Sequence, residues 1–344
     1  MNAPVGAATT HDNRRALAAV AIALLSALFF TMTYVLNRAI ANDGGHWAWT
    51  ASLRYLLTLP MLLPLMSWQG GIAPVWRALR AHPWAWLRCS AIGFVWFYLL
   101  LAYAAASGPA WLVAGSFQFT VIAGMLCAPL IYRSGKADDQ RRRIPRAGLA
   151  VGVLIVVGVL LMQFGHFNGR LDRAAWIALL CVLGSAVLYP LGNRLLLLHL
   201  ERSGESLGAT QRVFGMTLAS QPLWWLVAAF AWQQAGAPSM AQVSLAAGVA
   251  LSAGVIATIL FFQATGMVRD NPVALGAAEA MQAAELLFAT LLGVWWLHEA
   301  WPRGIALWGA ALVMLGIAAF SWVVARSTPG DVVDTQVLGG DRGA

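Results

Sequence analysis

The sequence predicts an all-α membrane protein, with ten transmembrane helices arranged as two inverted five-helix repeats. Composition is the first reason. Of the 344 residues, 60% are hydrophobic and 10% are charged, whereas soluble domains carry about 25% charged residues. A soluble fold of this length has no interior large enough for so much apolar surface, so lipid is expected to be the main solvent. The other two reasons are the apolar runs and the repetition of short motifs.

Apolar runs of about 20 residues, the length that crosses a bilayer as a helix, follow one another with short connections. They cover residues 16–40, 47–68, 84–106, 109–132, 145–165, 173–199, 207–232, 243–268, 272–297 and 303–325. Residues 16–165 are therefore expected to form the first repeat, with a basic loop at 133–146, and residues 173–325 the second. Residues 1–15 are expected to be a cytoplasmic tail, and the polar segment 326–344 a disordered one.

Basic residues predict the orientation. Most Lys and Arg outside the runs lie in connections that share a side with the two termini, and the loop 133–146 is the most basic. Because positive residues are retained on the cytoplasmic side, both termini are predicted to be cytoplasmic in a multi-pass protein of the inner (cytoplasmic) membrane. The same rule accounts for the net charge of +8, so no nucleic-acid partner is expected.

Neither a metal centre nor a cofactor is expected. The three cysteines, Cys89, Cys127 and Cys181, lie in apolar runs without a CxxC pair and are interpreted as packing residues. The six histidines are scattered, and no phosphate-binding glycine loop occurs. These features argue against an enzyme and against an ATP-driven pump made by this chain alone.

The two halves share a series of motifs in the same order: a Tyr followed by Asn-Arg, then an Arg, then Pro-Leu. In the first half these are Tyr34, Asn37-Arg38, Arg54 and Pro64-Leu65, and in the second Tyr189, Asn193-Arg194, Arg212 and Pro222-Leu223. Five helices is an odd number, so the second repeat enters the membrane in the opposite direction to the first. Inverted repeats are typical of secondary transporters, whose substrate site lies near the midplane between the repeats.

Two acidic residues, Glu279 and Glu285, lie well inside the run 272–297. Ionisable residues within the bilayer are costly and are functional candidates by default. With Gln282 midway between them, the two acids form one polar stripe along a helix. Glu279 is expected in the cytoplasmic half and Glu285 near or past the middle. This stripe is the candidate site of substrate binding or proton coupling.

Four arginines within the runs are candidate ion-pair or gate residues: Arg38, Arg54, Arg194 and Arg212. In one hypothesis, Glu285 pairs with Arg54 toward the outside and Glu279 pairs with Arg212 toward the cytoplasm. Breaking one layer while keeping the other would then give alternating access. In the alternative, the pairs are static and hold the helices together.

Further polar residues are candidates for lining a substrate cavity: Tyr34, Asn37, Gln118, Tyr189, Asn193 and Gln263. For each of them taken singly, a helix–helix hydrogen bond is the favoured alternative.

The end of the chain resembles the closing helix pair of the drug/metabolite transporter superfamily. The resemblance rests on Leu292-Gly-Val-Trp-Trp-Leu-His-Glu299, followed by Trp308-Gly309-Ala-Ala-Leu-Val-Met-Leu-Gly316. The segment from Asn37 to Tyr55 resembles the multidrug resistance efflux transporter branch. The resemblance spans about 16–325 and implies a ten-helix, five-plus-five fold and export of drugs or metabolites. The run 16–40 contains no acid, so the proton-coupling glutamate of the small four-helix relatives has no counterpart there.

We therefore predict a secondary active transporter that exports small molecules across the cytoplasmic membrane by alternating access with proton coupling. Two alternatives stay open: an amino-acid or other metabolite facilitator without proton coupling, and a membrane-embedded lipid-handling protein. The expected partners are a small-molecule substrate and membrane lipids. A duplicated chain can form its whole pathway as a monomer, and a weak dimer also stays open.

Overall fold

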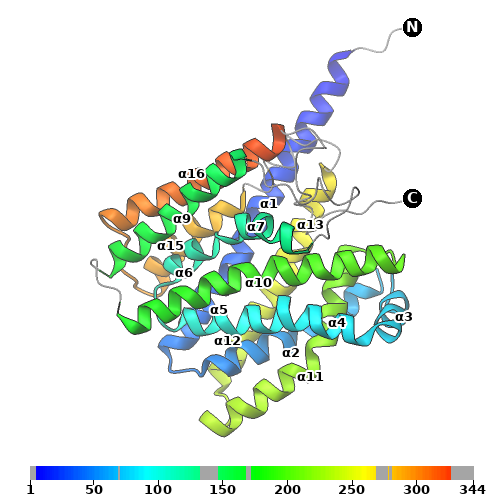
Figure 1. Ribbon diagram of the computed structural model, residues 1–344, viewed down its shortest axis with the longest axis horizontal. Coiled ribbons are helices and arrows are strands. Elements are labelled where there is room, and N and C mark those ends of the chain that lie inside the picture. The colour runs from blue at the N-terminus through cyan, green and yellow to red at the C-terminus, as the bar shows by residue number, and fades with distance from the viewer. Residues whose placement is uncertain are drawn as a thin grey trace.

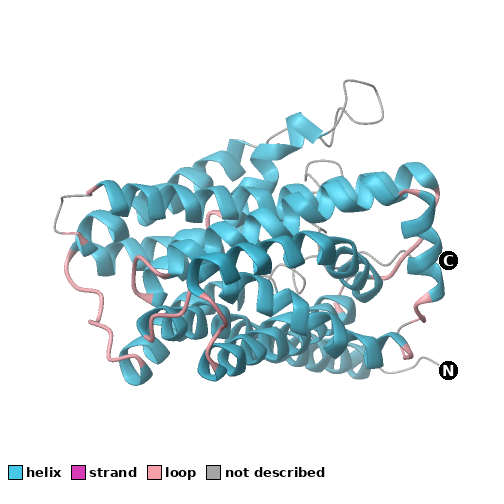
Figure 2. Ribbon diagram, turned by 90° about the horizontal axis from the view of Figure 1, so that it is seen from below, coloured by secondary structure: helices cyan, strands magenta, loops and turns pink. Residues whose placement is uncertain are grey.

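Helices dominate the part of the chain that the computed structural model describes, which is residues 5–68, 70–131, 146–167, 172–268, 278 and 281–326 (Figure 1). The first half contains α1 (Val5–Asn42), α2 (Trp47–Met66), α3 (Ala73–Ala81), α4 (Pro83–Ser90), the π-helical segment η1 (Ala91–Trp96), α5 (Phe97–Ala105), α6 (Ala110–Phe117), α7 (Thr120–Ile131) and α9 (Arg146–His166). The second half contains α10 (Arg173–Ser203), α11 (Ala209–Ala235), α12 (Met240–Val249), the π-helical segment η2 (Ala250–Ala257), α13 (Thr258–Met267), the 3₁₀ turn η3 (Met281–Ala283), α15 (Ala284–Trp296) and α16 (Ile305–Arg326). Figure 2 shows the short loops that join them.

The described helices have the length and composition of membrane spans. Five stretches are long and apolar enough to cross a bilayer: Arg14–Asn42, Pro83–Ala105, Arg173–Ser203, Ala209–Ala235 and Met240–Met267. Four shorter apolar helices accompany them: Ala110–Ala123, Ala150–His166, Met281–Trp296 and Ile305–Ala319. A helix satisfies its own backbone hydrogen bonds, so apolar helices of this kind are stable in lipid. The chain is an all-helical, multi-pass membrane protein over its described residues.

Several boundaries differ from the expected ones. α1 begins at Val5, inside the segment 1–15 that was expected to be a tail, because the Ala-rich stretch after Gly6 contains no helix breaker. The run 109–132 is not one helix, since α6 ends at Phe117 and α7 begins at Thr120. Apart from their terminal residues Arg146 and Arg326, the predicted loop 133–146 and tail 326–344 lie outside the described residues.

Helices of the first half pack on helices of the second half. α2 lies against α11, α9 against α16, and α6 against α15. α1 packs along η2 and α13, and α10 packs in the same way along η1 and α5. In Figure 1, α9 and α16 run side by side in the upper part of the view, and α2 and α11 lie together in the lower part. Each half thus completes its packing with the other half.

Glycines allow α9 and α16 to approach backbone to backbone. A Cβ atom added to Gly309 would lie 2.6 Å from the carbonyl oxygen of Gly158 and 2.6 Å from the backbone nitrogen of Met162. No side chain fits there, because real Cβ contacts are longer than 3.0 Å. Small residues at helix contacts are a recurrent device of membrane proteins, in which close packing drives association.

Irregular helical turns lie in the middle of both halves. The π-helical segments η1 and η2 interrupt the helices 83–105 and 240–267, one in each half. The helix after Pro109 is broken at Gln118, and η3 precedes α15 in the second half. π-turns and broken helices are frequent at functional sites of membrane transporters. These irregularities surround one cavity.

Candidate functional site

A cavity of about 280 Å³ lies between the halves. Side chains from α1, α2, η1, α5, α6, α7 and α10 meet there with side chains from α11, η2, α13, η3, α15 and α16. Its walls are mostly apolar and aromatic, with a few polar and charged groups. This composition is typical of small-molecule sites, where a few polar groups orient a ligand that apolar walls enclose.

Glu285 is the one acidic residue among those that line the cavity within the described chain. It lies in the first turn of α15, with 7% of its surface exposed. The hydroxyl group of Tyr34 on α1 donates a hydrogen bond of 3.1 Å to Oε2 of Glu285. Tyr34 also lines the cavity. The predicted acidic site is thus built from one helix of each half, and its second predicted acid, Glu279, lies outside the described residues.

Arg54 lines the cavity from α2 without forming the expected ion pair with Glu285. Its guanidinium carbon lies 4.1 Å from the ring centroid of Tyr98 and 5.4 Å from that of Tyr55. An arginine over an aromatic face gains a cation–π attraction. The residue is 9% exposed, and its buried Nη1 atom has no hydrogen-bond partner among the described residues. The expected ion pair between Glu285 and Arg54 is not formed. Each of the two side chains contacts a tyrosine instead: Tyr34 binds Glu285, and Tyr98 lies against Arg54.

Of the four candidate arginines, two line the cavity and two do not. Arg194 on α10 joins Arg54 in the lining and is buried. Arg212 lies near the start of α11, where its Nη1 donates a 2.9 Å hydrogen bond to the carbonyl oxygen of Leu207. Its predicted partner, Glu279, is outside the described residues. Arg38 lies near the C-terminal end of α1, outside the cavity lining, and pairs with Glu299.

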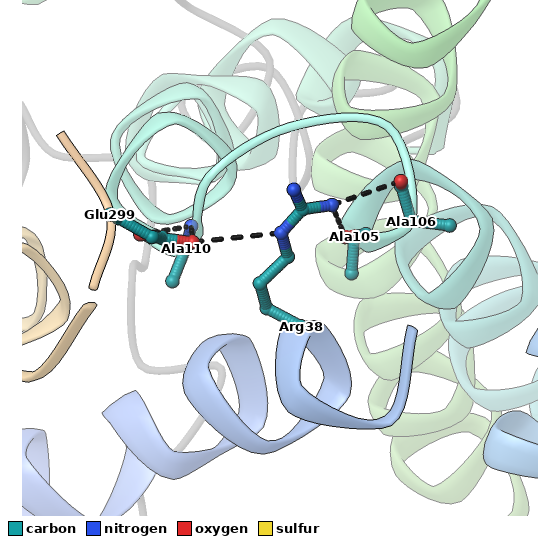
Figure 3. Close-up of polar contacts among 5 residues, drawn as sticks. All are labelled: Arg38, Ala105, Ala106, Ala110 and Glu299. Atoms are coloured by element: carbon teal, nitrogen blue, oxygen red, sulfur yellow. Dashed lines mark hydrogen bonds and ion pairs between the residues drawn. The ribbon is translucent and has the colours of Figure 1, made fainter. Parts of the chain in front are cut away.

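Arg38 at the end of α1 contacts two other chain segments: the end of α5 and Glu299 after α15 (Figure 3). Its Nε lies 3.6 Å from Oε1 of Glu299, and its Nη1 donates to the carbonyl oxygens of Ala105 at 3.4 Å and Ala106 at 3.0 Å. The Glu299 carboxylate also accepts the backbone N–H of Ala110, at 2.9 Å and 3.0 Å from its two oxygens. Because Ala110 opens α6, a negative charge there is also favoured by the helix dipole. We call these five residues, Arg38, Ala105, Ala106, Ala110 and Glu299, the Arg38–Glu299 clamp.

The backbone after α15 directs Glu299 into the clamp. The amide of Glu299 donates to the carbonyl oxygen of Gly293 at 3.0 Å, as does the amide of Leu297, and His298 between them has a φ of 54°. The helix thus ends with two amides on one carbonyl oxygen and with a left-handed residue directly before the second donor. A Cβ on Gly293 would collide with the Glu299 carboxylate. The sequence shows Glu299 only as the end of a family motif; its charge-pairing role was missed.

Two glutamines line the cavity where helices break. Gln118 follows the last residue of α6, and the amide of Val121 donates to its carbonyl oxygen at 3.1 Å. Gln282 lies within η3 on the opposite half, and its buried Nε2 has no partner among the described residues. Both side chains line the cavity. Broken helices present polar groups to a ligand near the bilayer midplane in many transporters.

Four aromatic rings form one wall of the cavity, which we call the aromatic wall: Tyr34, Phe97, Phe117 and Tyr189. Ring centroids lie 4.9 Å apart for Phe97 and Tyr189, 5.8 Å for Phe97 and Phe117, and 6.2 Å for Tyr34 and Phe117. These tilted contacts fall in the range that aromatic pairs prefer. Such a wall suits a ligand with a flat apolar part. Phe117 was missed because aromatic residues are frequent in every apolar run.

The remaining predicted cavity residues divide. Asn193 lines the cavity, and its Nδ2 donates 2.8 Å to the carbonyl oxygen of Tyr189. Asn37 is buried beside the cavity without lining it, since its Oδ1 accepts the hydroxyl group of Tyr98 at 3.0 Å. Gln263 lies on the exposed face of α13 and does not line the cavity. A polar residue in an apolar run is therefore not by itself a cavity residue.

The sequence model of the EmrE family, described as "Putative multidrug resistance efflux transporter", matches residues 17–326. The chain belongs to this family. The match confirms the resemblance seen in the helix pair around Glu299, and the family is one of transporters and not of enzymes.

Two curated relatives carry names without a function. The uncharacterized protein YjlA of Bacillus subtilis (strain 168) is 40% identical over 303 residues, covering 87% of this chain and 93% of the relative. An uncharacterized 42.1 kDa protein of Shouchella clausii, in the intracellular alkaline protease 3′ region, is 36% identical over 276 residues, covering 80% of this chain and 72% of the relative.

One solved crystal structure of a protein is similar in fold, with a TM-score of 0.53 and 16% sequence identity. The alignment covers 90% of this chain and 98% of that chain. At this identity the likeness is one of fold alone. It extends over nearly the whole helical bundle, both halves included.

Proposed function

We propose that this protein is a secondary active transporter that exports a small organic molecule across the cytoplasmic membrane by alternating access. The observation that carries the proposal is the cavity, which both halves line and around which their helices break at Gln118 and Gln282. A transport pathway needs polar groups inside the bilayer. Such groups are energetically costly there, and they typically mark substrate or ion pathways.

Ten spans in two inverted five-helix repeats are part of this proposal. In its support, α2 packs on α11 and α9 packs on α16, each the counterpart of the other in the proposed repeat. The contacts of α1 with η2 and α13 are matched by those of α10 with η1 and α5. An approximate two-fold axis in the membrane plane produces such a pattern, and it offers the protein two equivalent ways to tilt around the cavity.

The Arg38–Glu299 clamp closes the outer side in the proposed orientation. With the N-terminus in the cytoplasm, the end of α1, the α5–α6 loop and the α15–α16 loop all face outward. The clamp ties these three segments together through one carboxylate. An inward-facing state is expected to keep the clamp, and an outward-facing state to break it.

Glu285 is proposed to carry the coupling proton. It is buried in the cavity, it has no ion-pair partner among the described residues, and Tyr34 holds its carboxyl group by one hydrogen bond. A carboxyl group that contacts both the cavity and a neighbouring helix can exchange a proton for substrate when the two halves tilt. Arg54 and Arg194 in the same lining supply opposite charge at longer range.

The test is transport by the purified chain in proteoliposomes loaded with a defined mixture of organic acids, amines and amino acids. Mass spectrometry should show saturable loss of one class of solute, faster when an inward proton gradient is imposed. The Glu285→Gln variant should retain exchange at equal pH but should no longer respond to the gradient. Gradient-independent transport by the wild type would favour a facilitator, and non-saturable conductance would exclude a transporter.

A further inference from the structure

Among the described residues, the cavity lining contains more basic than acidic side chains. Its described lining contains two arginines, Arg54 and Arg194, and one acid, Glu285. A cationic substrate would have to enter next to these guanidinium groups at low dielectric. Like charges repel strongly in such surroundings. Arg54, which forms no ion pair among the described residues, favours a substrate with the opposite sign.

Arg54 has an unused hydrogen-bonding group in this cavity. Its Nη1 atom is buried without a partner among the described residues, although an unsatisfied buried donor is destabilising. Its guanidinium carbon lies over the ring of Tyr98, 4.1 Å from the centroid, and this contact restrains its position. A guanidinium group held in this way recognises carboxylates through charge-assisted hydrogen bonds. The missing partner is best supplied by the substrate.

The rest of the cavity sets the size and shape of that substrate. The volume of about 280 Å³ lies at the lower end of ligand pockets, which span roughly 300–1,000 Å³. The aromatic wall offers tilted ring faces to a flat apolar group. One ring with a short acidic side chain is a ligand that suits a site of this size.

We propose that the substrate is a small organic carboxylate with a flat apolar part, whose carboxylate binds Arg54 and whose apolar part contacts the aromatic wall. This inference rests on the proposed transport function and specifies its substrate class. It is narrower than the family description, which names no substrate charge.

Three probes with one scaffold separate the charge from the apolar contact: 3-phenylpropionate, 3-phenylpropanol and 3-phenylpropylamine. Binding to the full-length protein in detergent is measured by equilibrium dialysis, so the result does not depend on transport. The carboxylate should bind about ten-fold or more tightly than the alcohol, as charge-assisted hydrogen bonds imply. The amine should bind most weakly. A wild-type protein that prefers the amine, or that does not bind the carboxylate, overturns the proposal.

Variants assign the preference to Arg54. Arg54→Gln should lose about ten-fold or more in affinity for 3-phenylpropionate and little for 3-phenylpropanol, which shows that the cavity is still formed. Arg54→Lys keeps the charge and should lose less. Arg202→Gln, at an exposed position in the last turn of α10, is the matched control and should bind like the wild type. Unchanged carboxylate binding by folded Arg54→Gln, judged by size-exclusion chromatography and alcohol binding, overturns the proposal.

The two proposals fail in different ways. Carboxylate binding that depends on Arg54, together with no transport of 3-phenylpropionate in proteoliposomes, contradicts the transport function and leaves the binding inference standing. Saturable transport of 3-phenylpropylamine without carboxylate binding supports a transporter and contradicts the substrate class.

Discussion

Glu299 is the residue on which the outer clamp depends. One carboxylate accepts the Ala110 amide and lies 3.6 Å from the Arg38 guanidinium. In Glu299→Gln, the amide oxygen can still cap α6, but the charge that holds Arg38 is lost. We expect faster hydrogen exchange in the segment 105–112, measured by mass spectrometry. Asp43→Asn, at an exposed position after α1, is the control; equal exchange in both variants would argue against the clamp.

The pH dependence of stability has a defined sign at this residue, which lies in the loop outside the spans. Burial raises the pKa of the Glu299 carboxyl group above its ordinary value, while the Ala110 amide and Arg38 act in the opposite direction. The folded protein then retains a proton that the unfolded chain has released, so the free energy of unfolding falls as pH rises above about 4.5. Thermal unfolding in detergent should show this decrease in the wild type and a smaller one in Glu299→Gln.

His298 occupies a backbone conformation that disfavours most side chains. Its φ of 54° is left-handed, which costs roughly 1–2 kcal/mol for residues with a Cβ. A β-branched residue fits worse still, so His298→Val should lower the free energy of unfolding by about 1 kcal/mol. His298→Gly should be neutral or slightly stabilising, because relief of strain offsets the greater freedom of the unfolded chain. Thermal unfolding of both variants tests this; an unchanged stability of His298→Val would refute the left-handed conformation at this helix end.

At the scale of helices, the α9–α16 contact should be the least tolerant of added volume. Gly309→Ala places a methyl group 2.6 Å from the Gly158 carbonyl oxygen, and overpacking of this kind costs about 1–3 kcal/mol. The control is Gly266→Ala in α13, where a Cβ meets nothing within 4 Å, and where Ala should stabilise the helix by about 0.5–1 kcal/mol. Opposite shifts of the unfolding temperature are expected; a neutral Gly309→Ala would exclude tight packing there.

Most helices could be predicted because a segment that spans lipid must be both apolar and helical, so each long apolar run indicates a helix. The breaks inside them could not. Nothing in the composition around Gln118 announces the end of α6, since a π-turn or a one-turn interruption leaves the run apolar. The same limit applies to η2 in the second half. Irregular turns depend on which neighbouring helix supplies the missing contacts, and that information lies elsewhere in the chain.

The candidate site was predictable to the extent that polar groups stand out in apolar runs. Glu285, Arg54 and Arg194 were predicted on this basis, and all three line the cavity. Their partners were not predictable: Tyr34 binds Glu285 and Tyr98 lies against Arg54, because contacts depend on depth and rotation of each helix. Gln263, equally polar, is exposed. Periodicity identifies which residues share a helix, not which helices share a cavity.

For the whole molecule, the proposed orientation can be tested with two exposed serines. Ser107 lies in the α5–α6 loop, and Ser67 directly follows α2. With both termini in the cytoplasm, Ser107→Cys should react with a membrane-impermeant maleimide in intact cells. Ser67→Cys should react only after lysis. The native cysteines are not exposed and provide the background. The reverse labelling pattern would invert the topology.

The close approach of Gly158 to Gly309 and the Arg38–Glu299 clamp can form only late in the synthesis of the protein. Both contacts join an early segment to a late one. During synthesis, α9 and the end of α1 enter the bilayer long before their counterparts leave the ribosome. Until α16 is inserted, the glycine face of α9 is therefore exposed to lipid. Until Glu299 is synthesised, Arg38 has no carboxylate partner. A chain that stops before α16 should be recognised by membrane proteases as unfinished.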